Sequence, residues 1–319
     1  TAALACDRPY APRLAPSRRV GWRGSAGGAL ATFFARSPGC GHLQVNILVS
    51  RLLAYSLDES AVSVLYLASR LMELPLGVFT IAVATVFFPL LAKAFSTGDE
   101  AGFSTAFLQG LRLVIGISLP AGVGLYVLGE PIIELLFFWG AFGRADVMAT
   151  VPLLAIYGIG LPFYSAATFA TRGLHASKDM RTPVRVAGYC LLINFSVGLL
   201  LMQFWGACGL ATANVLAAIA QSYLLWRALS ARHAALSFCA MRLALAKLLL
   251  AGAVMGAACA ITSRWLNAFG FAEKLDAALA VAVCVPGGVC VYFALLYLLR
   301  FKELDALKAL LLRYFPKSK

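Results

Sequence analysis

The chain has 319 residues, of which 61% are hydrophobic and only 13% are charged, with a formal net charge of +13. A soluble domain would have about a quarter of its residues charged, so this composition excludes a soluble enzyme. The basic residues stand at the ends of apolar blocks and form no aromatic-laced patch, which argues against a nucleic-acid-binding protein. Blocks of about 20 apolar residues without strand-like alternation predict an all-α, polytopic bundle of membrane helices.

Residues 1–40 are rich in Arg, Pro, Gly, Ala and Ser, show no periodicity and lack the apolar core of a signal peptide. We expect this segment to be irregular or disordered. From Gln44 onward the apolar blocks predict about eight membrane helices, the second of which is interrupted by Pro75 and Pro89. Their approximate ranges are 41–57, 60–93, 103–128, 146–171, 183–204, 207–228, 241–266 and 275–300. The last stretch, 302–314, has its leucines on one side and predicts an amphipathic helix at the interface.

Lys and Arg in the short loops predict the orientation. If the first helix begins in the cytoplasm, the outer loops hold only Arg144, Arg264 and Lys274. The inner loops and the tail then hold fifteen basic residues: Lys93, Arg172, Lys178, Arg181, Arg185, Arg227, Arg232, Arg242, Lys247, Arg300, Lys302, Lys308, Arg313, Lys317 and Lys319. We therefore predict a multi-pass protein of the bacterial cytoplasmic (inner) membrane with a cytoplasmic C-terminus.

The sequence contains no pattern typical of a catalytic or metal site. Its eight cysteines form no C-x-x-C pair, and its three histidines are widely scattered. No phosphate-binding loop, nucleophile elbow or carboxylate pair is present. We expect no enzyme activity, no metal and no cofactor. Asn214 and other polar residues within the helices are expected to form interhelical hydrogen bonds, and Gly252 and Gly256 form a G-x-x-x-G that predicts close helix packing.

Two charged residues lie at membrane depth in the second predicted helix. Arg70 and Glu73 are three residues apart, so they share a helix face and can meet. A charge at this depth usually faces a partner or a wet cavity. One interpretation is a structural ion pair that holds two helices together. The other is that Arg70 projects into a hydrophilic cavity and binds an anionic headgroup through its planar fork, with the following Pro75 as a hinge or as a tolerated kink. Arg51, deep in the first helix, receives no role.

Five short motifs occur in order along the predicted helices: S-R-L-M-E-L-P-L-G at Ser69–Gly77, I-A-V-A-T-V-F-F-P-L-L-A-K at Ile81–Lys93, G-L-R at Gly110–Arg112, G-A-F at Gly140–Phe142 and K-D-M-R-T-P-V at Lys178–Val184. Together they closely resemble the MurJ (MviN) family, the lipid II flippases of peptidoglycan synthesis, within the multidrug/oligosaccharidyl-lipid/polysaccharide exporter superfamily. The resemblance covers about residues 43–300, and residues 1–40 do not resemble the family.

The resemblance implies a fold of fourteen helices, in which two six-helix lobes enclose a cationic cavity and two further helices form a lipophilic groove. Residues 41–228 then correspond to the second, C-terminal lobe, 229–301 to the groove pair and 302–319 to a cytoplasmic tail. A first lobe is absent from this sequence, so we expect a fragment that needs this N-terminal lobe for a complete cavity. Arg70 matches a cavity arginine proposed to bind the lipid pyrophosphate, and Glu73 a frequently acidic position, whereas Ser69 stands where the family often has Asp.

The implied function is the flipping of lipid II across the cytoplasmic membrane, with lipid II and membrane lipids as the partners. One alternative is a related exporter of lipid-linked oligosaccharides or drugs. The other is a membrane scaffold that transports nothing, because a single lobe cannot enclose a two-sided cavity.

Overall fold

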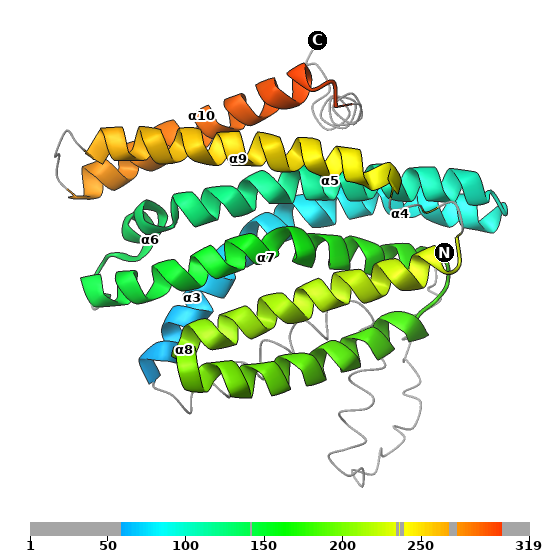
Figure 1. Ribbon diagram of the computed structural model, residues 1–319, viewed down its shortest axis with the longest axis horizontal. Helices are drawn as coiled ribbons and strands as arrows, with labels where there is room; N and C mark the ends of the chain where they lie inside the picture. Colours follow the sequence, from blue (N-terminus) through cyan, green and yellow to red (C-terminus); the bar gives the residue numbers. More distant parts are fainter. Residues whose placement is uncertain (1–58, 141, 234–235, 237–238, 268–272, 302–319) are drawn as a thin grey trace, which may run out of the picture. The chain divides into compact units, whose positions relative to one another are not determined.

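The computed structural model describes residues 59–140, 142–233, 236, 239–267 and 273–301, which belong to one compact unit, Gly39–Lys319. Across these ranges every regular element is a helix, which confirms the predicted all-α fold. The elements in Figure 1 are α3 (Glu59–Pro75), the π-helix η1 (Leu76–Thr80), α4 (Ile81–Ser96), α5 (Glu100–Val127), α6 (Gly129–Phe137), α7 (Arg144–Ala176), α8 (Arg181–Ser230), α9 (Cys239–Asn267) and α10 (Glu273–Leu298). The segment 1–40, the predicted helix 41–57 with Arg51, and the tail 302–319 lie outside the described residues.

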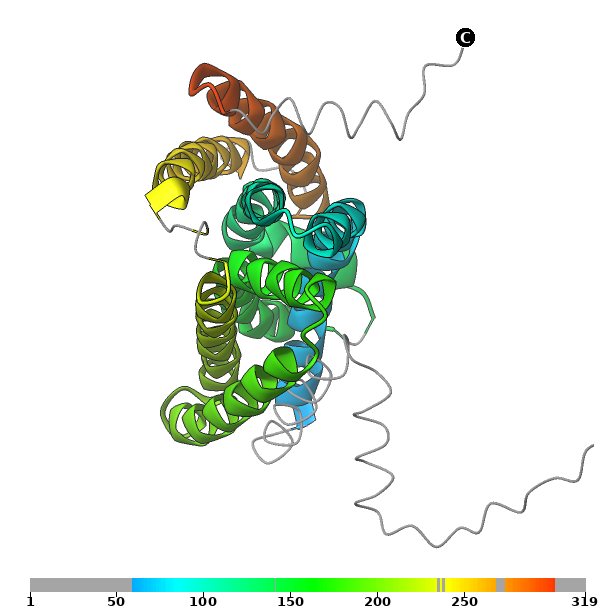
Figure 2. The same ribbon diagram turned by 90° about the vertical axis from the view of Figure 1, so that its right-hand side faces the viewer.

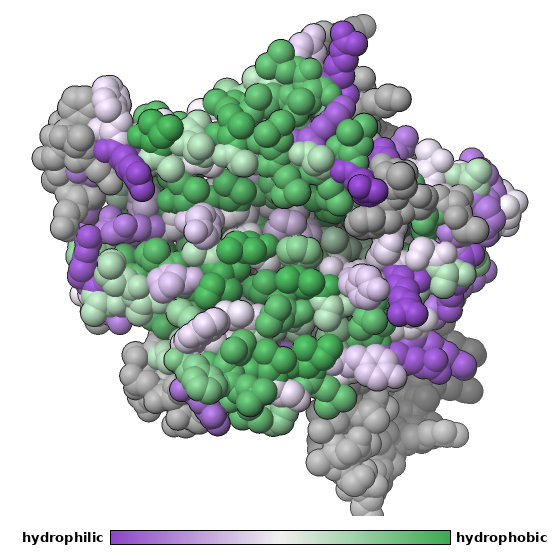
Figure 3. Space-filling view, viewed as in Figure 1, coloured by the Kyte–Doolittle hydropathy of each residue, from purple (hydrophilic) through white to green (hydrophobic). Residues whose placement is uncertain are grey.

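Six helical stretches of the described chain are long and apolar enough to cross a bilayer, and they correspond to the second to eighth predicted helices. The second predicted helix is continuous through α3, η1 and α4, because Pro89 leaves α4 unbroken and Pro75 is followed by a π turn. Apolar side chains cover the middle of the helices, and hydrophilic residues gather mainly toward the two ends (Figure 3). This distribution suits a hydrocarbon layer bounded by polar headgroups.

The element α8 contains two of the predicted helices. A straight helix of its 50 residues would be about 75 Å long, more than twice the thickness of a bilayer core. Gly206 interrupts it with φ 53° and ψ −129°, a conformation that favours glycine, and the chain turns back there (Figure 1). A Cβ on Gly209 would lie 2.3 Å from the carbonyl oxygen of Leu201, so the returning chain passes very close to the outgoing one.

The short helix α6 was not predicted from the sequence. At nine residues it is about 14 Å long and cannot span a bilayer. Arg144, the first residue of α7, pairs with both Glu130 and Glu134 of α6 and ties the two helices together. The apolar run between the two spans was too short for a membrane helix, although Glu130 and Glu134 are one helical turn apart and mark its polar face.

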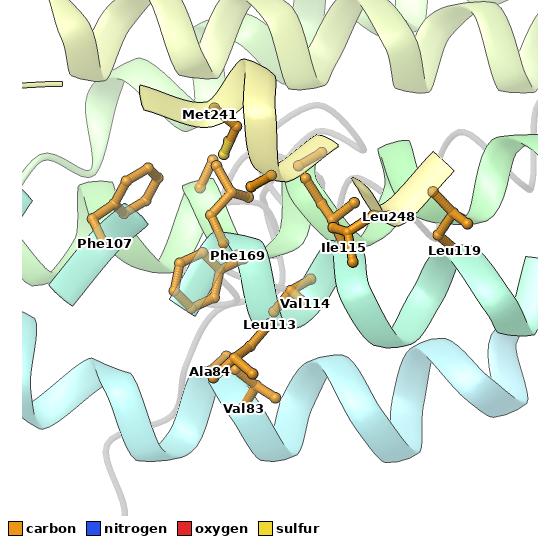
Figure 4. Close-up of a cluster of buried hydrophobic side chains, with 14 of the residues drawn as sticks. Val83, Ala84, Phe107, Leu113, Val114, Ile115, Leu119, Phe169, Met241 and Leu248 are labelled. Atoms are coloured by element: carbon orange, nitrogen blue, oxygen red, sulfur yellow. The ribbon is translucent and has the colours of Figure 1, made fainter. Parts of the chain in front are cut away.

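The core lies along α5, which packs against α4, α7 and α9. The ring centroids of Phe107 in α5 and Phe169 in α7 are 5.4 Å apart. Phe169 in turn contacts Phe87 of α4 edge-on, with the ring centroids 6.2 Å apart. Leu248 of α9 joins the same buried cluster from the other side (Figure 4). A second cluster joins α3, α7 and α8. The pair α9–α10 lies on the α5 side of the bundle, away from the α8 hairpin (Figures 1 and 2).

Candidate functional site

One face of α3 carries a strip of polar side chains. Ser63, Tyr66 and Arg70 are exposed and Glu73 is partly exposed. Because these residues are three or four apart, they lie above one another on the same face of the helix. The opposite face, with Val64, Ala68 and Met72 among others, is buried in the α3–α7–α8 cluster. Packing of the apolar face therefore directs the polar strip outward from the lobe.

The structure brings Arg70 and Glu73 together, as their spacing predicted. Nη1 of Arg70 donates a hydrogen bond to Oε2 of Glu73 over 2.7 Å, and the Arg70 side chain keeps 54% of its surface exposed. Both residues lie in α3, so the ion pair that the structure shows is formed within one helix. A guanidinium carries five N–H donors, and Glu73 engages one nitrogen.

Tyr66 belongs to the same site and was not predicted from the sequence. The guanidinium carbon of Arg70 lies 5.0 Å from the centroid of the Tyr66 ring, within the range of a cation–π contact. The spacing of four residues between them was the signal that could have revealed this contact. Ser69, by contrast, is buried, and its hydroxyl donates to the Tyr66 carbonyl. Arg70 is thus held between a carboxylate and an aromatic ring, and Ser69 does not face the polar strip.

A π turn follows the site directly. Pro75 ends α3, and η1 adds one residue to the turn before α4 continues. Thr80, its last residue, is buried, and its hydroxyl donates to the hydroxyl of Ser165 in α7 over 3.1 Å. Short π segments are frequent at functional sites, where the extra residue redirects the side chains that follow. Pro75 therefore stands where the regular helix of the polar strip changes its geometry.

The K-D-M-R-T-P-V motif has a structural explanation. Oδ1 of Asp179 accepts hydrogen bonds from the backbone N–H groups of Arg181 and Thr182 at the start of α8, and Oδ2 lies 2.8 Å from Arg232. Burial opposes ionisation of this carboxyl, but the Thr182 hydrogen bonds, the Arg232 charge and the Arg181 N–H together hold the pKa of Asp179 below its usual value. The motif thus caps α8 and joins both ends of its hairpin.

Comparison with known proteins decides the family. The family model described as "Lipid II flippase MurJ" matches residues 11–300. The chain belongs to the MurJ lipid II flippase family. This match begins earlier than the motifs, which covered about 43–300, and it includes most of the segment 1–40. Membership makes the chain a multi-pass membrane protein of a transporter family, consistent with its six apolar helical stretches.

Two curated MurJ relatives and one solved structure illustrate the similarity. The chain is 34% identical over 260 residues to "Probable lipid II flippase MurJ" of Rhizobium meliloti (strain 1021), covering 81% of this chain and 48% of the relative. It is 32% identical to the protein of the same name from Vibrio cholerae serotype O1, covering 82% and 50%. A structure titled "Lipid II flippase MurJ, inward closed conformation" aligns with a TM-score of 0.67 at 25% identity, over 82% of this chain and 52% of that one. The chain thus spans about half the length of these MurJ proteins.

Proposed function

We propose that this chain takes part in flipping lipid II across the bacterial cytoplasmic membrane, with Arg70 as a contact for the pyrophosphate. Membership of the MurJ family supports the substrate class. The chain supplies the C-terminal lobe, residues 41–228, and the pair 229–301, and a first lobe from outside these 319 residues completes the cavity. The protein then acts as a transporter and carries out no covalent chemistry.

The observation that carries this proposal is the position of Arg70. It is a half-exposed guanidinium within a membrane-spanning stretch, on a polar strip that packing directs away from the lobe interior. An arginine at such depth costs about 2.5–3.5 kcal/mol on insertion scales, and Glu73 engages only one nitrogen of Arg70, so the exposure of the guanidinium here favours a polar surrounding. A planar fork can hold two phosphate oxygens at once, which an ammonium cannot do. Glu73 sets the orientation of this fork and competes with the bound anion.

Movement of the lobe would use the same region. Transporters of this kind alternate by rocking one lobe against another around a midplane site. We infer that Pro75 and the π turn after it serve as the hinge, because α3 carries Arg70 whereas Thr80 holds the other side of the turn to α7. The polyprenyl tail would follow α9 and α10, whose exposed residues are mostly apolar. The distribution of Lys and Arg supports a cytoplasmic C-terminus.

Complementation tests the role of Arg70. The intact gene that encodes this chain is expressed in flippase-depleted cells with Arg70→Lys, Arg70→Ala or the matched control Arg185→Ala, which removes an exposed arginine from the start of α8. We expect Arg70→Ala to abolish growth and Arg70→Lys to reduce it at least tenfold, because lysine keeps the charge but loses the fork. Growth of both Arg70 variants equal to that of the control contradicts the headgroup role.

The same experiment separates the alternatives. Accumulated lipid-linked peptidoglycan precursor in cells carrying Arg70→Ala, with membrane expression unchanged, supports lipid II as the cargo. A related exporter of other lipid-linked sugars or of drugs leaves the precursor level unaffected by Arg70→Ala. A scaffold that transports nothing supports growth without regard to the residue at position 70, provided that the chain is present in the membrane.

A further inference from the structure

A proline in the middle of α5 leaves one backbone carbonyl without its helical partner. In an α-helix the carbonyl oxygen of residue 116 accepts from the N–H of residue 120. Residue 120 is a proline within α5 and has no N–H, so Gly116 cannot make this bond. In a membrane-spanning stretch such a carbonyl needs a donor from a neighbouring helix, because the hydrocarbon core contains no water that could donate to it.

Tyr292 of α10 supplies that donor. Its hydroxyl donates to the carbonyl oxygen of Gly116 over 2.8 Å, and its side chain is only 1% exposed. A buried tyrosine hydroxyl itself requires a partner, so the two polar groups satisfy each other. The bond joins residues 176 positions apart in the chain. It therefore ties the last described helix to the helix at the centre of the core.

The neighbouring helix α9 packs against the same stretch of α5. A Cβ on Gly252 would lie 2.3 Å from Cδ2 of Leu119, and a Cβ on Gly256 would lie 2.7 Å from Cγ1 of Val123. These two glycines are the predicted G-x-x-x-G, and the close packing expected of them is confirmed. Their contacts stand on either side of Pro120. Both helices of the pair thus meet α5 within one short stretch, 116–123.

We propose that the stretch 116–123 of α5, interrupted by Pro120, is a lock for the α9–α10 pair, and that the hydrogen bond from Tyr292 holds the pair in place. Pro120 leaves the Gly116 carbonyl without its usual donor in α5, α10 supplies a donor through Tyr292, and the glycines of α9 allow close approach. The pair is therefore a fixed part of the lobe and moves with α5. This holds whether or not the protein transports lipid II. If it does, the tail path keeps its position relative to α5 during transport.

Hydrogen–deuterium exchange, followed by mass spectrometry on the chain in detergent or nanodiscs, tests the lock. Tyr292→Phe removes only the hydroxyl. We expect amide exchange in α10 and around residues 116–123 to rise about three- to tenfold, the range that one helix–helix hydrogen bond in a membrane corresponds to. Exchange in the α8 hairpin stays unchanged. Tyr223→Phe, which changes an exposed tyrosine of α8, serves as the matched control. An unchanged α10, or an equal rise in α8, overturns the proposal.

A second background tests the cause. Pro120→Ala restores the N–H at position 120, so the Gly116 carbonyl regains its helical donor. In this background Tyr292→Phe is expected to change exchange in α10 by less than twofold. If Tyr292→Phe raises exchange in α10 as much with Pro120→Ala as without it, Tyr292 does not act through the carbonyl that Pro120 leaves unpaired, and the proposal is wrong. If Pro120→Ala does not fold, the local pattern in the single Tyr292→Phe variant against Tyr223→Phe decides the question.

Discussion

Two glycines bring α5 and α7 into backbone contact, and an added methyl group on either should force these helices apart. An ideal Cβ on Gly122 would lie 2.3 Å from the carbonyl oxygen of Gly158, and a Cβ on Gly158 would lie 2.6 Å from the carbonyl oxygen of Gly122. Carbon and oxygen approach to about 3.3 Å in the closest favourable contacts. Because the obstacle is backbone, Gly122→Ala requires a helix displacement of about 1 Å.

Gly124 provides a matched control in the same helix. A Cβ there would meet nothing within 4 Å. Replacing a helical glycine by alanine stabilises by about 0.5–1 kcal/mol through backbone entropy, and this gain is the same at both positions. It cancels when the variants are compared. Gly122→Ala should therefore be less stable than Gly124→Ala by about 1–3 kcal/mol, the usual cost of overpacking.

Thermal unfolding in detergent, followed with a thiol-reactive dye, measures this difference. Cys190, Cys259 and Cys284 are buried and become reactive only when the helices separate. At about 2–4 °C per kcal/mol, the midpoint of Gly122→Ala should fall at least about 2 °C below that of Gly124→Ala. Gly158→Ala should follow the same direction. Equal midpoints for Gly122→Ala and Gly124→Ala refute the close contact between α5 and α7.

Two further predictions concern buried polar groups. Asp179→Asn should lower the midpoint at pH 7 by the equivalent of about 1 kcal/mol, since it removes the charge that faces the half-exposed Arg232. Folding lowers the pKa of the Asp179 carboxyl, so its stabilisation of the fold is present above the unfolded pKa of about 3.9 and is lost as pH falls through the folded pKa. The difference in unfolding midpoint between Asp179→Asn and the parent should therefore close in acid. A difference in midpoint that does not change with pH contradicts this prediction. Thr80→Val and Ser165→Ala should each lower the free energy of unfolding by about 1–2 kcal/mol, because each change leaves the other buried hydroxyl unpaired. The double variant should lose less than the sum of the two single losses. Strict additivity in a double-mutant cycle contradicts this prediction.

The candidate site was predictable in part. Arg70 and Glu73 stand three residues apart in an apolar run, so their contact follows from helix geometry alone. That the Arg70 side chain is half exposed depended on which face of α3 is buried. The contact with Tyr66, four residues before Arg70, could have been predicted from the same helix geometry. Thr80 and Ser165 are 85 residues apart, and no local pattern connects them.

The sequence by itself determined the class, the family and nearly every membrane helix. Uninterrupted apolar blocks admit only helices in a bilayer, because each helix satisfies its own backbone hydrogen bonds. The break predicted between the helices 183–204 and 207–228 falls where Gly206 turns α8. The short α6 escaped prediction because it is too short to span a bilayer, and the π turn because a proline alone does not specify how the backbone accommodates it.

Only the tertiary structure decided which donor satisfies the carbonyl that Pro120 leaves unpaired. Pro120 indicates in the sequence that the carbonyl of Gly116 lacks a donor, and says nothing of where a donor comes from. Its partner, Tyr292, lies 176 residues away, and only the packing of α10 on α5 brings them to 2.8 Å. The spacing of apolar residues shows which face of a helix is apolar. It does not show which other helix packs against that face, because that helix comes from a distant part of the chain. The physical reason is that local hydrogen bonds form each helix, and distant side chains fit the helices to one another.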